Sequence, residues 1–307
     1  MMRVEELEQR AVTGTPVTLV LAGSRNRTSS EAALAAVSRC IARLVVIHDD
    51  PGKPPDPLIA AVAERVIDAN SEEACGAAAV GEAAREGKAI LLKGSLHSDA
   101  LLRAVVRHMK ATNQPGIVSD VIIMNDPFPI PGCGLLGIAD GGILVRPDVA
   151  QKIAICRNAV TVFHALGVSC PRVAVLSATE AVSPSVPSSG EAAQVRDAAS
   201  APDFPKCLVD GPLALDLAKV PEALSAKGHA SPLEGRADIL LVPNVESGNM
   251  LAKALYWLGC RPAAHVATGG PWPVLIPSRS EDEASKRASI ALAALASRCS
   301  PAQGQPR

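Results

Sequence analysis

The sequence predicts an α/β protein with mostly parallel sheets, and three observations support this. Apolar, strand-like runs alternate with Ala-rich helical stretches along most of the 307 residues, which is the pattern of repeated β-α units. Hydrophobic residues make up 48% of the chain but aromatic residues only 2%, so Ala, Val, Leu and Ile must fill the core. Such a core favours buried strands and Ala-rich helices over an antiparallel sandwich. The length also indicates two domains.

Turn residues and helix-start residues divide the chain into these elements. In the first part, the predicted strands are Val17 to Ala22, Leu44 to His48, Ala89 to Lys93 and Val118 to Met124, and the predicted helices are Ser29 to Arg43, Ser71 to Glu86 and Asp99 to Lys110. Later strands are Val173 to Ser177, Ile239 to Val242, Ala264 to Thr268 and Val274 to Ile276, and later helices are Val149 to Leu166, Glu191 to Ala198 and Gly248 to Leu258. A helical region starts at Leu213 to Leu217, after a short strand that ends before Gly211 and Pro212. Two Pro-rich stretches are predicted to be loops, namely much of Asn125 to Gly137 and all of Ser183 to Gly190.

Composition also limits the class of protein. A formal net charge of -1 and few aromatic residues argue against a nucleic-acid binder. The eight cysteines are scattered, without a CxxC motif or a Cys/His cluster of metal-ligand spacing, so we expect reduced thiols and no metal site. The N-terminus lacks an apolar signal core, and no apolar run reaches the ~18 residues of a membrane span. The sequence therefore predicts a cytoplasmic protein without a membrane segment.

The segment PVLIPSRSEDEASKRASIALAAL carries the first candidate anion site. A strand ends there in the pair Ser278-Arg279, and a helix follows after a short acidic segment. A guanidinium at a strand end can donate two hydrogen bonds to phosphate or carboxylate oxygens. The alternative is an ordinary strand-loop-helix turn with a solvated arginine.

A second candidate lies in KGSLHSDALLRAVV. Lys93 and Gly94 stand at a strand end, Ser95 and Ser98 lie in the loop before a helix, and Arg103 falls in its second turn. Ser98 or the aspartate after it can cap that helix, whose free amides attract anions. The alternative for Arg103 is a solvated helix residue.

Polar residues also follow the strand ILLV. Asn244, Glu246, Ser247 and Asn249 cluster there, and ligands of open α/β sheets bind beyond the carboxyl ends of strands. Asn249 and Ser247 could instead cap the next helix, which is the interpretation we favour for Ser247.

Common nucleotide and hydrolase motifs do not explain the chain. Neither a phosphate-binding GxxxxGK[ST] sequence nor a GxSxG sequence is present. Gly132, Gly134 and Gly137 spell GxGxxG, but they follow a Pro-rich loop and no helix follows at once, so we interpret them as loop glycines.

Taken in order, these segments resemble the phosphate acetyltransferase and phosphate butyryltransferase family, from about Lys93 to Leu295. The matching segments are KGSLHSDALLRAVV, IADGGILVRPDVAQKIAICRNAV, LGVSCPRVAVLSATEAV, LVDGPLALDLA, KGHASPLEGRADILLVPNVESGNMLAKAL and PVLIPSRSEDEASKRASIALAAL. The pattern looks closer to the butyryltransferase branch and to enoyl-CoA hydratase/phosphate acetyltransferase-like proteins.

The resemblance implies reversible transfer of a short acyl group, acetyl or butyryl, between coenzyme A and inorganic phosphate. It implies no permanently bound cofactor, a homodimer, and a fold similar to isocitrate and isopropylmalate dehydrogenases, with two domains flanking a cleft. Projected here, residues 1–114 and 266–307 form the first domain and residues 115–265 the inserted second domain. Ser278, Arg279 and Arg103 match the family residues that position phosphate and thioester. In the reverse direction the coenzyme A thiol must lose its proton, so the reaction also requires a base.

The chain departs from the family pattern at Asp120, Ala139 and Leu144, which replace a histidine, a threonine and an asparagine. Ser285 stands where acetyltransferases carry an aspartate. These changes predict a more apolar acyl pocket or a weaker activity. One alternative hypothesis is a catalytically impaired paralogue that binds coenzyme A or an anion and acts as a regulatory subunit. Another is an oxidative decarboxylase, which we disfavour because the sequence shows no metal-binding Asp cluster.

Overall fold

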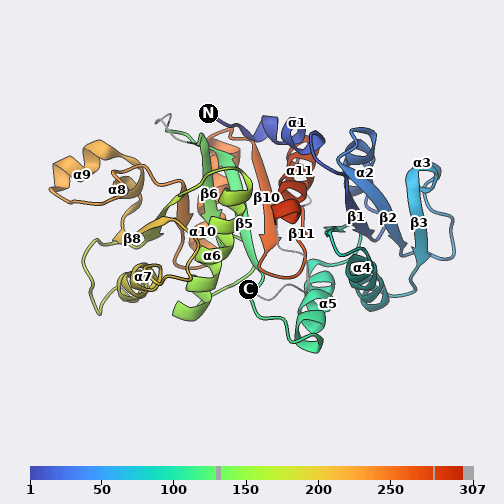
Figure 1. Ribbon diagram of the computed structural model, residues 1–307, viewed down its shortest axis with the longest axis horizontal. Coiled ribbons are helices and arrows are strands. Elements are labelled where there is room, and N and C mark those ends of the chain that lie inside the picture. The colour runs from blue at the N-terminus through green and yellow to red at the C-terminus, as the bar shows by residue number, and fades with distance from the viewer. Residues whose placement is uncertain (129–132, 279–280, 300–307) are drawn as a thin grey trace. The chain divides into compact units, whose positions relative to one another are not determined.

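The computed structural model describes residues 1–128, 133–278 and 281–299, and it confirms a mixed α/β fold with mostly parallel strands (Figure 1). The chain forms two compact units. Unit 1 comprises residues 1–4 and 117–263, and unit 2 comprises residues 5–116 and the chain from residue 264 onward.

Unit 2 contains the first four strands and the last two. The strands are β1 (Val17–Ala22), β2 (Ala42–His48), β3 (Ala63–Asp68), β4 (Ala89–Lys93), β10 (Ala263–Thr268) and β11 (Val274–Leu275). The helices are α1 (Leu7–Val12), α2 (Arg27–Ser38), α3 (Pro57–Val62), α4 (Glu72–Glu86), α5 (Ser98–Ala111) and α11 (Glu283–Cys299), with a 3-10 turn η1 (Val4–Glu6) before α1. The strand order is β3-β2-β1-β4-β11-β10, and all neighbours are parallel except β10 and β11.

Every residue of β1 is buried, because helices cover both faces of this sheet. Helix α4 contacts β1, β2 and β4 and packs against α5, whereas α2 and α11 pack against each other and also contact β1 (Figure 1). A strand covered on both faces needs a continuous apolar run rather than an alternating one, which is why VTLVLA was recognisable in the sequence.

Unit 1 contains the remaining strands. They are β5 (Ser119–Asn125), β6 (Leu135–Ala139), β7 (Arg172–Leu176), β8 (Leu208–Leu213) and β9 (Ile239–Leu241). The helices are α6 (Val149–Ala165), α7 (Pro187–Ala198), α8 (Leu215–Lys219), α9 (Pro221–Lys227) and α10 (Val245–Lys253), and a π-helical turn η2 (Ala254–Leu258) continues α10. The strand order is β5-β6-β9-β7-β8, with only β5 antiparallel to its neighbour.

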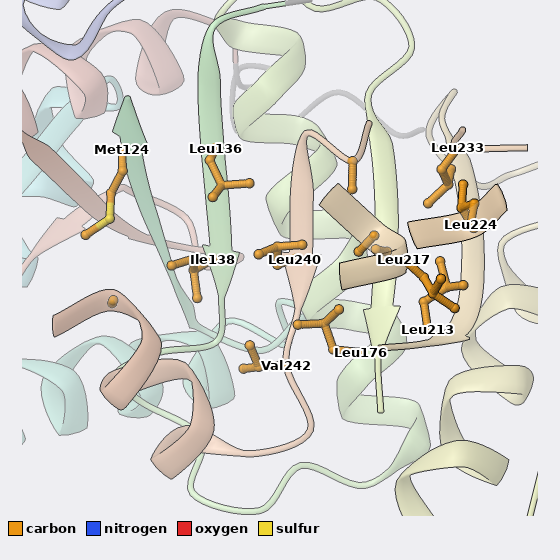
Figure 2. Close-up of a cluster of buried hydrophobic side chains, with 14 residues drawn as sticks. Met124, Leu136, Ile138, Leu176, Leu213, Leu217, Leu224, Leu233, Leu240 and Val242 are labelled. Carbon is orange, nitrogen blue, oxygen red and sulfur yellow. The ribbon is translucent and has the colours of Figure 1, made fainter. Parts of the chain in front are cut away.

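Leucine side chains dominate one hydrophobic core of unit 1 (Figure 2). Leu136 and Leu240 come from the sheet, and Leu217 and Leu224 come from the short helices α8 and α9. Burial of one such side chain stabilises the fold by about 1.5–3 kcal/mol, so two helices too short to persist alone are held by this core.

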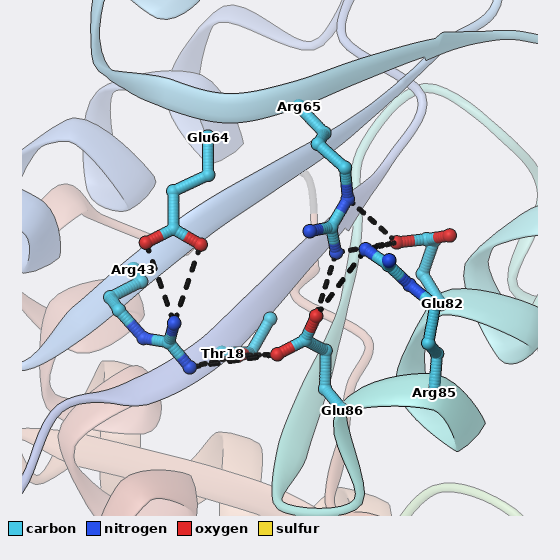
Figure 3. A network of polar contacts seen from close by, with 7 residues as sticks. All are labelled: Thr18, Arg43, Glu64, Arg65, Glu82, Arg85 and Glu86. Atoms are coloured by element: carbon cyan, nitrogen blue, oxygen red, sulfur yellow. Dashed lines mark hydrogen bonds and ion pairs between the residues drawn. The ribbon is translucent and has the colours of Figure 1, made fainter.

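A network of charged side chains ties α4 to the amino ends of β1 and β2 (Figure 3). Arg65 of β3 donates to Glu82 at 2.6 Å and to Glu86 at 2.7 Å, while Arg43 and Glu86 both bond the Thr18 hydroxyl, at 3.0 and 3.1 Å. Because acids and bases balance here, we interpret this end of the sheet as structural.

Three sequence predictions need correction. Ser183 to Gly190 is not all loop, since α7 begins at Pro187, and proline is well tolerated in the first turn of a helix. Helix α2 ends at Ser38 rather than continuing to Arg43, because Cys40 adopts a positive φ of 57° before β2. Gly211 and Pro212 lie within β8 rather than after it.

Within the described ranges, no helix combines the length and apolar character that a membrane crossing requires.

Candidate active site

The carboxyl ends of β1 and β4 lie side by side in unit 2. From β1 the chain proceeds outward through β2 to β3, and it then returns to place β4 on the other side of β1. Such a reversal of strand order is where open α/β sheets bind ligands. The loops that follow β1 and β4, residues 23–26 and 94–97, therefore form the candidate ligand-binding region of unit 2.

These two loops touch through their backbones. The amide of Gly94 donates to the carbonyl of Ala22 at 2.8 Å, and the amide of Ser95 donates to the carbonyl of Gly23 at 3.3 Å. A Cβ atom on Gly94 would lie 1.7 Å from the Gly23 oxygen, so only glycine fits. Gly23 itself has a φ of +86°, a conformation that glycine adopts at little cost.

Asp49, just after β2, connects both loops through its carboxylate. It accepts hydrogen bonds from the Ser24 amide at 3.1 Å, from Arg25 Nε at 3.0 Å and from the Ser95 hydroxyl at 2.7 Å. Burial raises the pKa of Asp49, but the bonds from Arg25, Ser95 and the Ser24 amide together with the Arg25 charge outweigh burial and keep that pKa below its ordinary value. The group is thus a charged anchor at neutral pH.

Of the predicted binding residues, Lys93, Gly94 and Ser95 lie at this strand end. Lys93 is half-buried, and its carbonyl accepts a bond from Ser29 of α2 at 3.1 Å. Ser98 is the first residue of α5, and the N-cap is His97 without a side-chain cap bond. The prediction that Ser98 or Asp99 caps this helix is therefore wrong.

Ser278 lies three residues beyond β11 and is exposed. Its amide donates to Glu281 Oε1 at 3.0 Å, and the Glu281 amide donates back to the Ser278 carbonyl at 3.3 Å. Burial raises the pKa of Glu281, but His265, 3.5 Å away, together with the Ser278 amide and Lys286 outweighs burial and keeps that pKa below its ordinary value. Arg279 lies outside the described residues, so its predicted role stays a prediction.

Arg103 projects from α5 with an exposed side chain. It donates to Asp99 at 2.6 Å, an (i, i+4) pair on the helix surface. Arg107 of the same helix pairs with Glu73 of α4. The role of Arg103 in anion binding stays a prediction.

In unit 1, the polar residues after β9 mainly organise α10. Asn244 is the N-cap and forms a capping box with Ser247, whose amide donates to the Asn244 side chain at 2.9 Å. This confirms the interpretation of Ser247 as a capping residue. The Asn249 side chain donates to the carbonyl of Gly141 at 3.2 Å and so links α10 to the loop after β6.

That loop is held by Asp140, which is 2% exposed. Its carboxylate accepts bonds from the amides of Gly142, Ile143 and Leu144 at 2.8, 2.9 and 3.1 Å. Burial first, and then the nearby Asp120 carboxylate, raise the pKa of Asp140 to about 6. A carboxyl group that titrates near neutrality lies therefore at the carboxyl end of β6.

Sequence reasoning missed Arg25, Asp49 and the pairing of Glu281, in the acidic segment after Ser278, with His265. Arg25 and Asp49 directly follow two correctly predicted strands, in the sequences AGSR and IHDD, so the strand-end argument could have found them. Among the described residues, no group of three or more His, Cys, Asp or Glu side chains is arranged to hold a metal ion.

The fold and these strand-end loops define an α/β protein with polar and cationic groups at the carboxyl ends of parallel strands. Residues 58–294 match the family described as phosphate acetyl/butaryl transferase, and the chain belongs to this family.

Curated relatives carry both names of that family. The chain is 38% identical to phosphate acetyltransferase of Rhizobium meliloti over 75% of this chain and 72% of the relative. It is 35% identical to phosphate butyryltransferase of Clostridium acetobutylicum over 68% of this chain and 69% of the relative. The crystal structure of a branched-chain phosphotransacylase from Enterococcus faecalis superimposes with a TM-score of 0.76 at 29% identity, covering 91% of this chain and 99% of that one.

Proposed function

We propose that the protein is an acyltransferase that moves a short acyl group between coenzyme A and inorganic phosphate. The observation that carries this proposal is the family match over residues 58–294, together with relatives named for acetyl and for butyryl transfer. Coenzyme A and its thioester act as substrates here, and no permanently bound cofactor is needed. The cytoplasm stays the predicted location.

In the proposed reaction, a phosphate oxygen attacks the thioester carbonyl, the carbon–sulfur bond breaks, and the thiolate leaves. Negative charge develops on the carbonyl oxygen and on sulfur, and arginine or hydroxyl donors aimed at these atoms stabilise it. We assign this role to Ser278, Arg279 and Arg103. In the reverse direction the thiol must lose a proton to a base.

The dehydrogenase-like domain arrangement also stays a proposal. Residues 1–114 with 266–307 and residues 115–265 are the two proposed domains, with a substrate cleft between them. Lys93, Gly94, Ser95 and Ser98 would serve this cleft from the first domain, and Asn244 and Asn249 from the second.

The direct test is thioester formation from coenzyme A and acetyl or butyryl phosphate, followed by ultraviolet absorbance. Turnover supports the proposal, whereas binding of coenzyme A without turnover would favour the regulatory paralogue. Replacement of Arg279 by alanine should lower kcat/KM by about 30- to 1000-fold, equivalent to about 2–4 kcal/mol. The variant Arg279→Lys should keep only part of the wild-type kcat/KM, because an ammonium group cannot donate two parallel hydrogen bonds in the way a guanidinium does. Near-normal turnover of Arg279→Ala would contradict the assigned role.

The acyl preference depends on the two departures from the family pattern. Ala139 is fully buried in β6, and Leu144 is half-buried in the following loop. If they line the acyl pocket, longer aliphatic chains should be preferred, by about 1–3 kcal/mol per methylene. The double variant Ala139→Thr, Leu144→Asn should shift the preference toward acetyl, and an unchanged preference would place both residues away from the pocket.

We also propose a homodimer formed through α10 and η2. Met250, Trp257 and Leu258 are 66%, 57% and 85% exposed, so three large apolar side chains lie on one segment. Such a surface often marks an interface. Light scattering should give twice the 31.6 kDa chain mass, and Leu258→Asp should give the monomer. A monomeric wild-type protein at micromolar concentration would contradict this.

A further inference from the structure

Unit 2 contains a cavity of about 670 Å³ at the carboxyl ends of β1 and β2. Its wall combines apolar side chains such as Leu34 and Ile59 with three cations and three carboxylates, namely Arg25, Arg27, Lys53, Glu31, Asp50 and Asp56. The volume is in the range of small-molecule sites, about 300–1,000 Å³, and it exceeds what inorganic phosphate alone would fill. The mixed wall suits a molecule that carries both an anionic and an apolar part.

Arg25 presents one edge of its guanidinium to the protein and keeps the other available. Nε and Nη2 bond Asp49 at 3.0 and 2.9 Å, and the side chain is 57% exposed. Among the described residues, its Nη1 donates to no protein acceptor. Since a guanidinium carries five N–H groups, the edge formed by Nη1 and the second Nη2 hydrogen can still donate two parallel bonds to an anion.

Asp49 fixes the position of this arginine. Its side chain is only 8% exposed, and it also bonds the Ser24 amide and the Ser95 hydroxyl. An arginine held by a buried carboxylate loses less side-chain entropy when it binds an anion than a free one does.

The part of the cavity wall formed by His48 and residues 50–53 is also held in place. His48 is 3% exposed, and its Nε2 lies 2.8 Å from the carbonyl of Asp50 and 2.7 Å from that of Lys53. Carbonyl oxygens only accept, so Nε2 carries a hydrogen, and Nδ1 forms a hydrogen bond with the Ser24 hydroxyl, 2.7 Å away. The imidazole thus ties residues 50–53 to the loop after β1.

The remaining charges at the cavity are paired locally. Arg27 is 90% exposed and pairs with Glu31, and Lys53 lies 3.8 Å from Asp50. The Asp56 carboxylate caps α3 by accepting from the amide of Leu58 at 2.8 Å. Exposed pairs of this kind contribute little, so Arg25 is the cation that the fold itself positions.

We propose that this cavity binds the phosphate group of a small molecule with an apolar part, with Arg25 as the anion contact and Asp49 as its positioning residue. This deepens the proposed function, on which it rests, because coenzyme A, acyl phosphates and inorganic phosphate all carry that group. Arg25 would then be a substrate-binding residue beside Ser95.

The test is calorimetric titration of the full chain with coenzyme A, butyryl phosphate and inorganic phosphate as separate arms. Arg25→Ala should weaken binding at least tenfold in the arm whose phosphate occupies the cavity. Arg25→Lys should weaken binding less, because lysine keeps the positive charge but cannot donate two parallel hydrogen bonds from one planar group. A loss confined to coenzyme A identifies its phosphates as the bound group, and a loss confined to butyryl phosphate identifies the acyl phosphate. A loss confined to inorganic phosphate would contradict the apolar part of the proposed ligand.

Arg39→Ala is the matched control. Arg39 lies at the other end of α2, pairs with Glu8 at 2.9 Å and is 53% exposed, so it matches Arg25 in side-chain exposure and in having a carboxylate partner, but it does not line the cavity. Its removal should leave all three affinities unchanged. Equal affinities of Arg25→Ala and Arg39→Ala in every arm would overturn the inference. Turnover of the wild type is measured separately and tests the proposed acyltransferase function. Failure of the cavity proposal can therefore be distinguished from failure of the proposed function.

Discussion

Asp49 and Asp140 are both well-shielded carboxylates at the carboxyl ends of strands, yet their pKa values shift in opposite directions. Asp49 lies against Arg25 and its pKa is lowered, whereas Asp140 lies near Asp120 and its pKa is raised to about 6. Burial is the largest influence on both and raises both pKa values. At Asp49 the bonds from Arg25, Ser95 and Ser24 outweigh burial, whereas at Asp140 the Asp120 carboxylate adds to burial and the three backbone amides do not compensate for the two together.

The two loop regions also differ in how they are held. In unit 2, Asp49 connects loops from different strands, which touch at Gly23 and Gly94. In unit 1, Asp140 binds amides within four residues of itself. The first region thus depends on the order of strands in the sheet, and the second on local sequence. Four substitutions test this comparison, three of them within the two loop regions and one, Arg103→Ala, on the exposed surface of α5.

The largest effect is expected from Gly94→Ala. The new Cβ would lie 1.7 Å from the Gly23 carbonyl oxygen, and neither can rotate away, because the oxygen is a backbone atom and the Cβ position is fixed by the backbone of residue 94. We expect a loss of about 3 kcal/mol or more in the free energy of unfolding, measured in urea. Gly81→Ala in α4, where nothing lies within 4 Å, should instead stabilise the protein by about 0.5–1 kcal/mol. Equal effects would contradict the contact.

A pH effect of similar size is expected at Asp140. Because its folded pKa of about 6 exceeds the ordinary 3.8, the folded state keeps a proton that the unfolded chain loses between these values. The stability of the wild type should therefore fall relative to Asp140→Asn as pH rises from 4 to 7, by about 3 kcal/mol in total. Asp120→Asn should narrow the pH range over which this difference in stability develops. If the free energy of unfolding, measured in urea, depends on pH in the same way for the wild type and Asp140→Asn, the raised pKa would be contradicted.

Asp49→Asn should have a smaller effect of opposite pH dependence. The lowered pKa means that the charged form stabilises the fold at neutral pH and that this contribution is lost as pH falls through the folded pKa. We expect a loss of about 1–3 kcal/mol at pH 7, shrinking in acid, measured by urea unfolding. Asp50→Asn, with its ion pair at 3.8 Å, is the neighbouring control and should cost less than about 0.5 kcal/mol.

The smallest effect on stability is expected from Arg103→Ala. Its pair with Asp99 joins side chains that are 62% and 77% exposed, and such surface pairs contribute roughly 0.3–0.5 kcal/mol. The midpoint of urea unfolding should hardly move. If turnover nevertheless falls, the role of Arg103 is in binding or catalysis, and a large loss of stability would instead show a structural role.

Much of the fold could be predicted because buried parallel strands are continuous apolar runs. Strands Val17–Ala22 and Ala89–Lys93 have the predicted boundaries. Strand β3 was missed because Ala63–Asp68 alternates between half-buried and exposed residues and carries charges, so it contains no such run. Strand β6 was missed because Gly137 interrupts its apolar run, and the interpretation of Gly137 as a loop glycine is wrong, since it lies within Leu135–Ala139.

The candidate site was predicted less completely, for a physical reason. Ser95 could be proposed from its place after a strand, but its bond to Asp49 joins residues 46 positions apart in the chain. That bond depends on β2 and β4 lying on either side of β1, and periodicity in the sequence does not specify this order. The coupling of Asp120 with Asp140 likewise depends on the antiparallel pairing of β5 with β6.

Unit 2 is assembled from two separate stretches of chain, and this has a consequence during synthesis on the ribosome. Helix α11 packs against α1 and α2, and its Arg287 and Lys286 bond Glu8 at 3.1 Å and Thr28 at 2.7 Å. Strand β11 covers an edge of β4. All of unit 1 therefore emerges before the first 116 residues find these partners. Until then the nascent chain exposes an open strand edge and apolar helix faces, which chaperones bind and which aggregate when left uncovered.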